Sequence, residues 1–352
     1  MSQKSLIVRK VNHKNLISYL KIKKIRKIYN SFKKNIISNK INENLAVAIS
    51  GGPDSLALTF LVKCLSEEIK LKVLYLHVNH KLRNESGKEA LFLKKKLKLF
   101  GIDIKILNWN GVKPNSNIQS KARKIRYDLI LKEINKKKIT KILVGHTQED
   151  VLENFFIRLV RGSGLHGFVS LNNKISQIGK YTLVRPLINI KKEELIYISN
   201  KVFKFYIKDI SNDDEKYTRV RIRKLIEHLS KEGLDTKKIN LSLFNLKSSN
   251  DIINFYVNKN ILQNSKLITQ KKMFFLNNLF FIQPNEIIFR SLNIILKEIN
   301  GKYYPPRGKK VINLIKSIKN SKSKKITISR CVIEKLQNSY LIYSENQKKV
   351  IN

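Results

Sequence analysis

The spacing of hydrophobic residues divides the chain into three regions. Apolar residues recur at helical intervals over residues 16–37, which predicts a helix inside a basic lead-in, residues 1–42. From Leu45 onward, short continuous apolar runs alternate with stretches of helical spacing. Continuous runs are typical of strands buried on both faces, and the alternation predicts strand–helix–strand units. We therefore expect residues 43–224 to form a doubly wound, mostly parallel α/β domain.

The same pattern predicts the individual elements of this domain. Apolar runs predict strands over residues 45–50, 71–78, 103–109, 141–145 and 181–184. Helical spacing predicts helices over residues 55–69, 85–100, 118–135, 149–161 and 192–203. The carboxyl ends of parallel strands meet at one edge of a sheet, so we expect a ligand to bind there.

Beyond residue 224 the pattern changes. Residues 226–299 have mostly helical spacing, and the tail mixes a helix with two strand-like runs, 325–328 and 339–343. We expect residues 225–352 to form a smaller, largely helical region with mixed structure toward its end.

Composition excludes several classes of protein. No apolar stretch approaches the roughly 20 residues of a membrane-spanning helix. The N-terminus also lacks the apolar segment of a secretory signal, so we expect a cytoplasmic protein that does not contact a membrane. The two cysteines, Cys64 and Cys331, form no closely spaced pair, which disfavours a disulfide framework or a cysteine-rich metal site.

The balance of charges is strongly basic. Lys and Arg number 71 against 26 Asp and Glu, which gives a formal net charge of +45. Basic side chains neutralise phosphates, so one interpretation is a nucleic-acid partner. The other is compositional drift, because Lys, Asn and Ile are abundant along the whole chain. Charge alone does not decide between the two.

The sharpest local signal is a six-residue string between a predicted buried strand and a predicted helix, Ser50-Gly51-Gly52-Pro53-Asp54-Ser55. The two glycines let the backbone approach a ligand closely, and Pro53 suits the first turn of a helix. Backbone amides, two serine hydroxyls and the helix dipole together predict an anion site. Asp54 adds negative charge, which makes sense if Mg²⁺ lies between this carboxylate and bound phosphates. The string is not a Walker A motif, because no Gly-Lys-Ser/Thr follows it.

Two acidic residues are spaced to share one face of a predicted helix. Asp150 and Glu153 lie three residues apart, and neighbouring carboxylates repel each other unless a cation lies between them. The pair could hold the cationic groups of a substrate. Equally, acids are common in the solvated first turn of a helix. The pattern alone leaves both interpretations open.

The six-residue string resembles the SGGxDS signature of the PP-loop ATP pyrophosphatases. Further segments resemble, in order and spacing, those of the lysidine synthases of this superfamily, over residues 45–225. These segments are 77–83 (HVNHKLR), 119–127 (QSKARKIRY), 145–154 (GHTQEDVLEN), 159–167 (LVRGSGLHG), 185–187 (RPL) and 209–212 (DISN) with Arg219, Arg221 and Arg223. The family's paired aspartates stand here as Glu149-Asp150.

The resemblance implies a Rossmann-like PP-loop fold and a defined reaction. Lysidine synthases use ATP to join free L-lysine to the wobble cytidine of an isoleucine tRNA, tRNA(Ile), that carries a CAU anticodon. The cytosine 2-carbonyl oxygen is adenylated, and the lysine ε-amine then displaces AMP. The implied roles are ATP binding for residues 50–55, catalysis for Asp54 and Arg123, lysine binding for Asp150 and Glu153, and tRNA binding for Arg219, Arg221, Arg223 and the region 225–352.

Two other functions fit part of the pattern. A tRNA thiolation enzyme shares the loop, but such enzymes generally need cysteines to carry sulfur or hold a cluster, and Cys64 lies inside a predicted helix. A non-catalytic basic RNA-binding protein would explain the charge but leaves the loop and the Asp150–Glu153 pair without a role. We therefore expect an ATP-dependent ligase that modifies tRNA.

Overall fold

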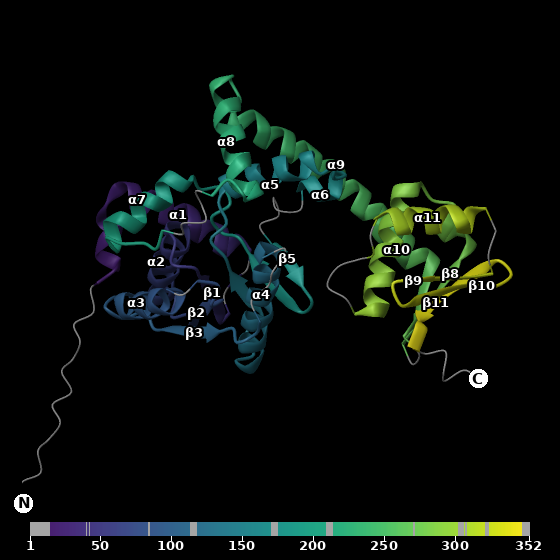
Figure 1. The fold of residues 1–352 in the computed structure, drawn as a ribbon, viewed down its shortest axis with the longest axis horizontal. Coiled ribbons are helices and arrows are strands. Elements are labelled where there is room, and N and C mark those ends of the chain that lie inside the picture. Colours follow the sequence, from purple (N-terminus) through teal and green to yellow (C-terminus); the bar gives the residue numbers. More distant parts are fainter. Residues whose placement is uncertain are drawn as a thin grey trace, which may run out of the picture. The chain divides into compact units, whose positions relative to one another are not determined.

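The computed structural model shows two compact units, residues 1–239 and residues 240–352 (Figure 1). The residues that it describes are 15–39, 41, 43–83, 85–112, 118–169, 175–208, 214–269, 272–301, 306, 308–320 and 324–346. Within these ranges, no helix is long and apolar enough to span a bilayer.

Six strands form the sheet of the first unit, in the order β3-β2-β1-β4-β6-β5. They are β1 (Leu45–Ile49), β2 (Val73–Asn79), β3 (Ile104–Asn108), β4 (Lys141–Leu143), β5 (Ile175–Ile178) and β6 (Tyr181–Val184). β5 pairs antiparallel with β6 at one edge, and the other pairings are parallel. The five parallel strands lie where the apolar runs predicted them, which confirms the mostly parallel α/β class.

The strand order reverses at the centre of this sheet. β1 pairs with β2 on one side and with β4 on the other. The chain runs outward from β1 through β2 and β3, and then returns to the opposite side of β1 as β4. Ligands of open α/β sheets bind where the order reverses in this way, beyond the carboxyl ends of the strands. The string at residues 50–55 follows β1 directly, so the topology brings it to this point.

Alternate residues of β1 face two layers of helices. Leu45, Val47 and Ile49 belong to the larger core. The helices that contribute to this core are α1 (Lys23–Ser38), α2 (Pro53–Glu68), α3 (Ser86–Lys98) and α7 (Lys192–Val202). Ala46 points to the other layer, where helix α4 (Ile118–Lys136) contributes Ile130. Both faces of the sheet are therefore covered, as a continuous apolar strand requires.

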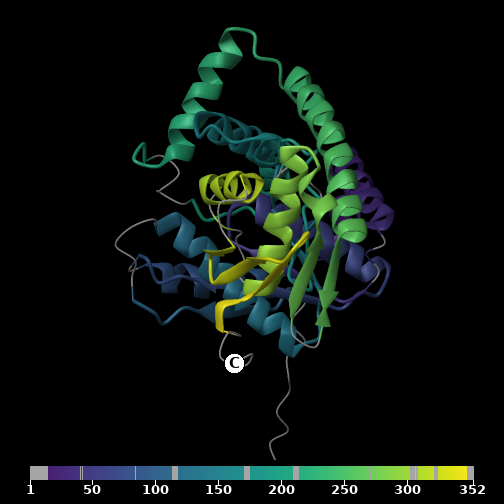
Figure 2. The same cartoon turned by 90° about the vertical axis from the view of Figure 1, so that its right-hand side faces the viewer.

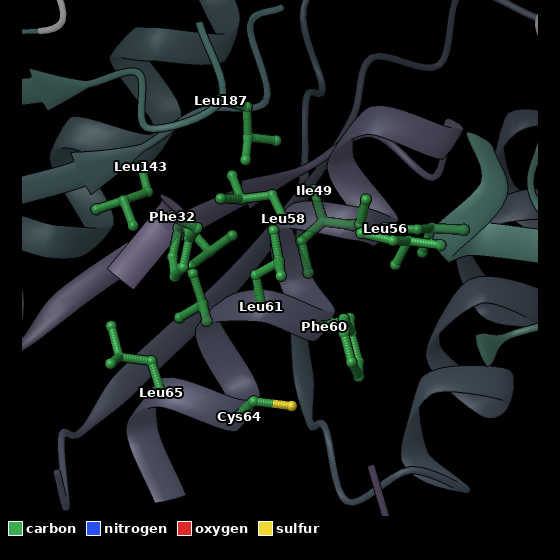
Figure 3. Packing of buried hydrophobic residues seen from close by; sticks show 14 of the residues in the cluster. Phe32, Ile49, Leu56, Leu58, Phe60, Leu61, Cys64, Leu65, Leu143 and Leu187 are labelled. Atoms are coloured by element: carbon green, nitrogen blue, oxygen red, sulfur yellow. The ribbon is translucent and has the colours of Figure 1, made fainter. Parts of the chain in front are cut away.

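Helix α2 anchors the larger core and holds the string that precedes it. Nearly every residue from Ser55 to Leu65 is buried, so the helix is enclosed on all sides. Figure 3 shows part of this packing, with Phe32 of α1 among the leucines of α2. A helix that is apolar around its whole circumference belongs in a core. Its N-terminus is thereby fixed at the sheet edge.

The predicted N-terminal helix over residues 16–37 is interrupted. A 3₁₀ helix, η1 (Ile17–Lys21), precedes α1, and the backbone is extended at Ile22 between them. Helix α1 then buries Ile25, Phe32 and other apolar residues in the larger core. The lead-in therefore packs on the α/β layer.

The first unit also contains α5 (Gln148–Val160), α6 (Leu165–Val169) and α8 (Thr218–Lys231). Leu152 and Phe156 of α5 pack against Ile222 of α8 in a small separate cluster. This contact holds α8 beside α5, whose N-terminus lies just beyond β4.

The second unit is built on a five-stranded antiparallel sheet, in the order β7-β8-β11-β10-β9. Its elements are α9 (Thr236–Asn264, beginning in the first unit), β7 (Ser265–Ile268), β8 (Met273–Asn277), η4 (Asn278–Phe281), α10 (Asn285–Asn300), α11 (Gly308–Lys319), β9 (Lys325–Ile328), β10 (Cys331–Lys335) and β11 (Ser339–Ser344). Helices α10 and α11 pack on one face of the sheet (Figures 1 and 2). The sheet is larger than the two strand-like runs indicated, because apolar runs as short as residues 273–276 do not distinguish a strand from a buried helix by their period.

Candidate active site

The string at residues 50–55 forms a tight loop organised by one hydroxyl group. Oγ of Ser55 accepts hydrogen bonds from the backbone amides of Ser50 and Gly51, at 3.2 and 3.1 Å. It donates to the carbonyl oxygen of Gly52 at 2.9 Å. Oγ of Ser50 lies 3.1 Å from the same hydroxyl. The two serines, expected to face an anion, thus shape the loop from within.

With both serine hydroxyls used inside the loop, the backbone amides and the dipole at the start of helix α2 are left to bind an anion. The helix begins at Pro53, and no side chain caps its N-terminus. The first amides of a helix have no partner inside the helix, and together with its dipole they favour negative charge. These backbone donors are therefore available to an anion, which is the role that the sequence led us to expect for the loop.

Gly51 permits this loop because of both its backbone angle and its surroundings. Its φ is +91°, and a Cβ built there would lie 2.7 Å from Cδ1 of Ile207. The backbone amide of Ile207 also donates to the carbonyl oxygen of Gly51 at 2.9 Å. The segment after α7 therefore lies against this loop, and a side chain at position 51 would have to displace Ile207 as well as adopt a positive φ.

We predict that Gly51→Ala destabilises the first unit more than Gly179→Ala does. Both positions have positive φ, but a Cβ at Gly179 would meet nothing within 4 Å. The backbone strain, about 1–2 kcal/mol, is common to both variants, whereas crowding adds about 1–3 kcal/mol at Gly51 alone. Thermal unfolding of the two variants measures the difference. Equal losses would show that Ile207 does not constrain the loop.

Gly145 brings the end of β4 against the same loop. A Cβ at this position would lie 3.1 Å from the backbone carbon and oxygen of Asp54. Contacts this close to backbone atoms cannot be relieved by a side-chain movement. The sequence did not indicate this requirement, because it depends on the distance between two segments far apart along the chain.

Three helix N-termini converge beyond β1 and β4. They carry Asp54 of α2, Glu149 of α5 and Lys192 of α7. The backbone amide of Lys192 donates to Oε1 of Glu149 at 3.0 Å. Oδ1 of Asp54 and Oε2 of Glu149 are buried, and within the described part of the chain neither has a hydrogen-bond partner. Buried carboxylate oxygens without partners are costly, so they indicate that a cation or donor belongs there.

Asp54 has a strongly altered acidity. Burial, together with the nearby charges of Asp150 and Glu149, raises the pKa of this carboxyl to about 7, against the opposing charges of Lys192 and Arg223. A buried carboxyl group that titrates near neutral pH is typical of a functional site.

Asp150 and Glu153, expected to share a cation, have different partners. Oδ2 of Asp150 accepts from the backbone amide of Thr147 at 2.9 Å, and the Thr147 hydroxyl accepts from the amide of Asp150 at 3.4 Å. This reciprocal cap fixes the first turn of α5. Glu153 is buried and forms an ion pair with Arg223 of α8, with 2.5 Å between Oε1 and Nε. The cation beside Glu153 is therefore supplied by the chain itself.

Two histidines at this edge are held neutral. Burial lowers the pKa of His146 to about 3, and its Nδ1 accepts a hydrogen bond from Nε of Arg185 at 3.1 Å. Burial, with Arg126 and His77 nearby, lowers the pKa of His80 to about 4. Both His80 ring nitrogens are buried without a partner among the described residues. Neither side chain is therefore an imidazolium at neutral pH, although each neutral ring keeps one N–H donor.

The expected arginines do not act as one group. The positive charges of Arg123 and Arg219 each lower the pKa of His146, which places both arginines near this imidazole. The guanidinium of Arg123 also lies 5.2 Å from the centre of the Tyr127 ring. Arg221 is exposed and donates to the carbonyl oxygen of Glu215 at 2.6 Å. Residues four apart share a face of a helix, so α8 (Thr218–Lys231) turns Arg219 and Arg223 to one side and Arg221 to another.

Two further expectations concern this edge. The segment 209–212 (DISN) lies outside the described residues.

Within the described ranges, no three His, Cys, Asp or Glu side chains are grouped to hold a metal ion by themselves. Mg²⁺ usually binds one or two carboxylates together with substrate phosphates, so the unpartnered oxygen of Asp54 fits such a shared site.

Known proteins share both the sequence pattern and the fold of this chain. The sequence profile of the PP-loop domain matches residues 21–229. The tRNA(Ile)-lysidine synthase of Orientia tsutsugamushi is 31% identical over 312 residues, which cover 86% of this chain and 70% of that protein. The synthase of Wolbachia pipientis wMel is 32% identical over 313 residues, covering 87% and 72%.

A solved structure shares the fold at lower identity. The U34-tRNA thiolase NcsA from Methanococcus maripaludis, determined with its 4Fe–4S cluster, superposes with a TM-score of 0.52 and 18% identity. The match covers 61% of this chain and 75% of the thiolase. At this identity the likeness concerns the fold alone.

Proposed function

We propose, on the premise that this chain belongs to the tRNA(Ile)-lysidine synthase family of PP-loop proteins, that it joins L-lysine to the wobble cytidine of tRNA(Ile) with a CAU anticodon. As a member of that family the chain is an ATP-dependent ligase that modifies tRNA. The observation that carries the proposal is the convergence of the uncapped N-terminus of α2 with Asp54, Glu149 and Asp150 at the centre of the sheet edge.

The first half-reaction would activate the base. The amides at the start of α2 bind the pyrophosphate of ATP, while the cytosine 2-carbonyl oxygen attacks the α-phosphorus and pyrophosphate leaves. Asp54 would hold Mg²⁺, which neutralises charge on the phosphates when it is bound. Arg123 would stabilise the negative charge that develops as the phosphorus is attacked.

The second half-reaction would use the acids of α5. Asp150 keeps Oδ1 free of hydrogen bonds within the described residues, so this oxygen is available to the ammonium groups of lysine. A carboxylate has about four acceptor positions, so Glu153 can accept from lysine while it remains paired with Arg223. The lysine ε-amine, once deprotonated, attacks C2 of the adenylated cytosine and AMP leaves.

Recognition of the tRNA would involve both units. Arg219 and Arg221 lie on α8 near the edge of the sheet, and we propose that they contact the tRNA backbone. The second unit, within residues 225–352, would bind another part of the same tRNA, for which the net charge of +45 is favourable.

Thiolation is the second candidate, because a thiolase has the same fold. The chain has two cysteines, Cys64 in the core of the first unit and Cys331 in the core of the second. Both thiols are buried, and burial raises the pKa of Cys64 to about 12, so it forms little thiolate at neutral pH. Neither residue is placed to carry sulfur, which favours the ligase reaction.

The experiment that tests the proposal supplies the chain with ATP, Mg²⁺, radiolabelled lysine and tRNA(Ile) with a CAU anticodon. We expect lysine to enter the tRNA with one AMP released for each lysine. The control is the same tRNA with uridine in place of the wobble cytidine, which should accept no lysine. Sulfur transfer, or RNA binding without AMP release, would exclude the proposed reaction.

We predict that Asp150→Asn raises the KM for lysine about 10- to 100-fold and leaves the KM for ATP nearly unchanged. The amide oxygen of asparagine can still cap α5, so the helix persists, but the charge-assisted bond to an ammonium group, about 1.5–3 kcal/mol, is lost. Asp128→Asn, on an exposed part of α4, is the matched control. A similar rise in both KM values would argue against a lysine pocket at this position.

A further inference from the structure

The second unit contains a small cavity at one end of its sheet. Its volume is about 250 Å³, and the described residues that line it belong to η4 and its end, the end of α11, and the hairpin between β10 and β11. Pockets that enclose drug-sized molecules measure about 300–1,000 Å³, so this cavity suits a smaller group, such as one nucleobase. It shares no described residue with the candidate active site, which is built from the first unit.

The floor of the cavity is apolar and aromatic. Phe281 and Tyr340 are only 6% and 8% exposed, and their ring centres lie 4.6 Å apart. Ile282 also lines the cavity, but it is 65% exposed. A large apolar side chain that stays exposed beside aromatic rings offers a surface on which the face of a planar ring can rest.

The polar tip of the β10–β11 hairpin forms part of the rim. The backbone amide of Leu336 donates to the carbonyl oxygen of Ser339 at 2.9 Å, which closes a tight turn. This turn leaves Gln337 and Asn338 exposed beside the cavity. An amide side chain both donates and accepts hydrogen bonds, as the edge of a nucleobase does. The rim can therefore bind the polar edge of a base whose face lies on the floor.

One lysine of the cavity lies on the face of the sheet that forms the core. Residues of a strand alternate between the two faces, so Lys335 shares its face with Cys331 and Ile333, which are buried with α10 and α11. Its cross-strand partner is Tyr340 of the cavity floor. A lysine that faces inward at the end of a strand keeps its charge only where water or an anion reaches the ammonium group.

A second lysine approaches the cavity from the end of α11. Nζ of Lys319 donates to Oδ1 of Asn285 at 2.7 Å, so a neutral amide positions this ammonium group without cancelling its charge. None of the described residues that line the cavity is acidic. Two ammonium groups with no carboxylate beside them in the lining favour an anion, and phosphate is the anion that accompanies each base of a nucleic acid.

We propose that this cavity binds a single unstacked nucleotide of RNA, with its base on the floor beside Ile282 and its phosphate at Lys319 and Lys335. The bases of a duplex are stacked and their edges are paired, whereas unpaired loops and ends can insert a base into a pocket. The source of the nucleotide rests on the proposed function: we assign it to an unpaired part of the tRNA. A free nucleotide has the same chemistry, so the experiments below separate the two sources.

Affinity for tRNA, measured without ATP or lysine, tests the site independently of lysine incorporation. Lys319→Met combined with Lys335→Met should raise the Kd for tRNA about 10-fold and should lower the slope of log Kd against log salt by about 1. Lys309→Met combined with Lys310→Met removes the same charge from exposed positions at the other end of α11, and it should raise the Kd no more than about 3-fold. Equal effects of the two pairs would overturn the proposal, because they would show a diffuse response to charge.

A variant of the exposed turn guards against a folding defect. Asn338→Asp leaves the floor intact and should raise the Kd for tRNA about 10-fold, because its carboxylate competes with the phosphate for the two lysines. Asn313→Asp, on an exposed position of α11 that does not line the cavity, is the matched control. An unchanged Kd for Asn338→Asp would count against a phosphate at this rim.

Thiol protection identifies the occupant, since both natural cysteines are buried. Alkylation of Gln337→Cys should be slowed by tRNA and by a short single-stranded RNA, but not by a blunt RNA duplex of the same length. Asn313→Cys should react at the same rate throughout. Equal protection by the duplex, or protection by an acidic peptide and not by RNA, would overturn the nucleotide site. Protection by micromolar AMP or CMP, with an unchanged Kd for tRNA in the Lys319–Lys335 double variant, would overturn tRNA as the source and assign the cavity to a free nucleotide.

Discussion

Replacing Asp54 with asparagine is expected to reduce AMP release at least about 100-fold while it stabilises the folded protein above neutral pH. The loss of activity follows if this carboxylate organises Mg²⁺ and the phosphates of ATP, because removing one such electrostatic contact typically costs two to three orders of magnitude, about 100- to 1,000-fold. Affinity for tRNA should remain near that of the wild type, since Asp54 lies at the start of α2, inside the nucleotide loop.

The gain in stability has the same cause as the loss of activity, namely removal of the negative charge of Asp54, because that charge is costly to bury. Burial raises the pKa of Asp54 from 3.8 to about 7, so the folded chain keeps a proton that the unfolded chain has released. The stability that depends on this proton is complete below pH 4 and is lost as the pH rises through 7. Asparagine is never charged, so the variant avoids a loss on the order of 4 kcal/mol at alkaline pH.

Two measurements on the same variant check this prediction. The difference in unfolding temperature between Asp54→Asn and wild type should grow from pH 5 to pH 8, and it should be absent for Asp128→Asn on the exposed side of α4. Wild-type AMP release by Asp54→Asn would remove this residue from the mechanism. A stability difference independent of pH would show that the carboxyl is not buried as the fold indicates.

Breaking the ion pair between Glu153 and Arg223 is expected to have the second large effect. Arg223→Met leaves the buried carboxylate of Glu153 without its partner, and removal of one member of a buried pair typically costs about 3–5 kcal/mol. We expect a value near the lower limit, about 3 kcal/mol, because the Arg223 side chain remains 30% exposed. Lysine incorporation should also fail, because the orientation of Glu153 is no longer fixed.

A double variant separates the structural role from the functional one. Replacing both residues, as Glu153→Met with Arg223→Met, should recover most of the stability, since an apolar pair can replace a buried ion pair at little cost. Lysine incorporation should remain absent if Glu153 binds lysine. Recovery of both properties would show that the pair serves only to join α5 and α8.

The ion pair of Arg290 with Glu286 in the second unit provides the comparison. The Arg290 side chain is buried, with 2.7 Å between Nε and Oε1. Arg290→Met should therefore lower the unfolding temperature of the second unit without changing the KM for lysine. A change in that KM would mean that stability alone accounts for the Arg223 result.

The sequence was sufficient for the parallel strands of the first unit and for the helices between them, but it did not indicate β5, α6 or the break at Ile22. The run at Leu45–Ile49 and the residues at helical spacing in α2 specify their own conformations, because a strand buried on both faces and an enclosed helix each require a continuous or periodic set of apolar residues. The turn at residues 50–55 could likewise be predicted from the sequence alone, since glycine, proline and serine at fixed spacing define a local turn. Local chemistry of this kind does not depend on distant residues.

The second unit was harder to anticipate. Strands β7 and β8 span four and five residues in a chain that is rich in Ile, Leu and Phe throughout. Runs this short have no resolvable period, and their pairing partners, such as β11, lie far along the chain. The hydrogen bonds of the sheet, which no single segment can supply, decide their conformation.

Only the tertiary structure decided which charges act together. Sequence spacing grouped Asp150 with Glu153, and Arg219 with Arg221 and Arg223. The folded chain instead pairs Glu153 with Arg223 and uses Asp150 to cap α5. The need for glycine at position 145 and the raised pKa of Asp54 arise in the same way, from segments that approach only when the sheet has formed. Electrostatic and steric energies depend on distance in space, and the order of residues along the chain does not contain that distance.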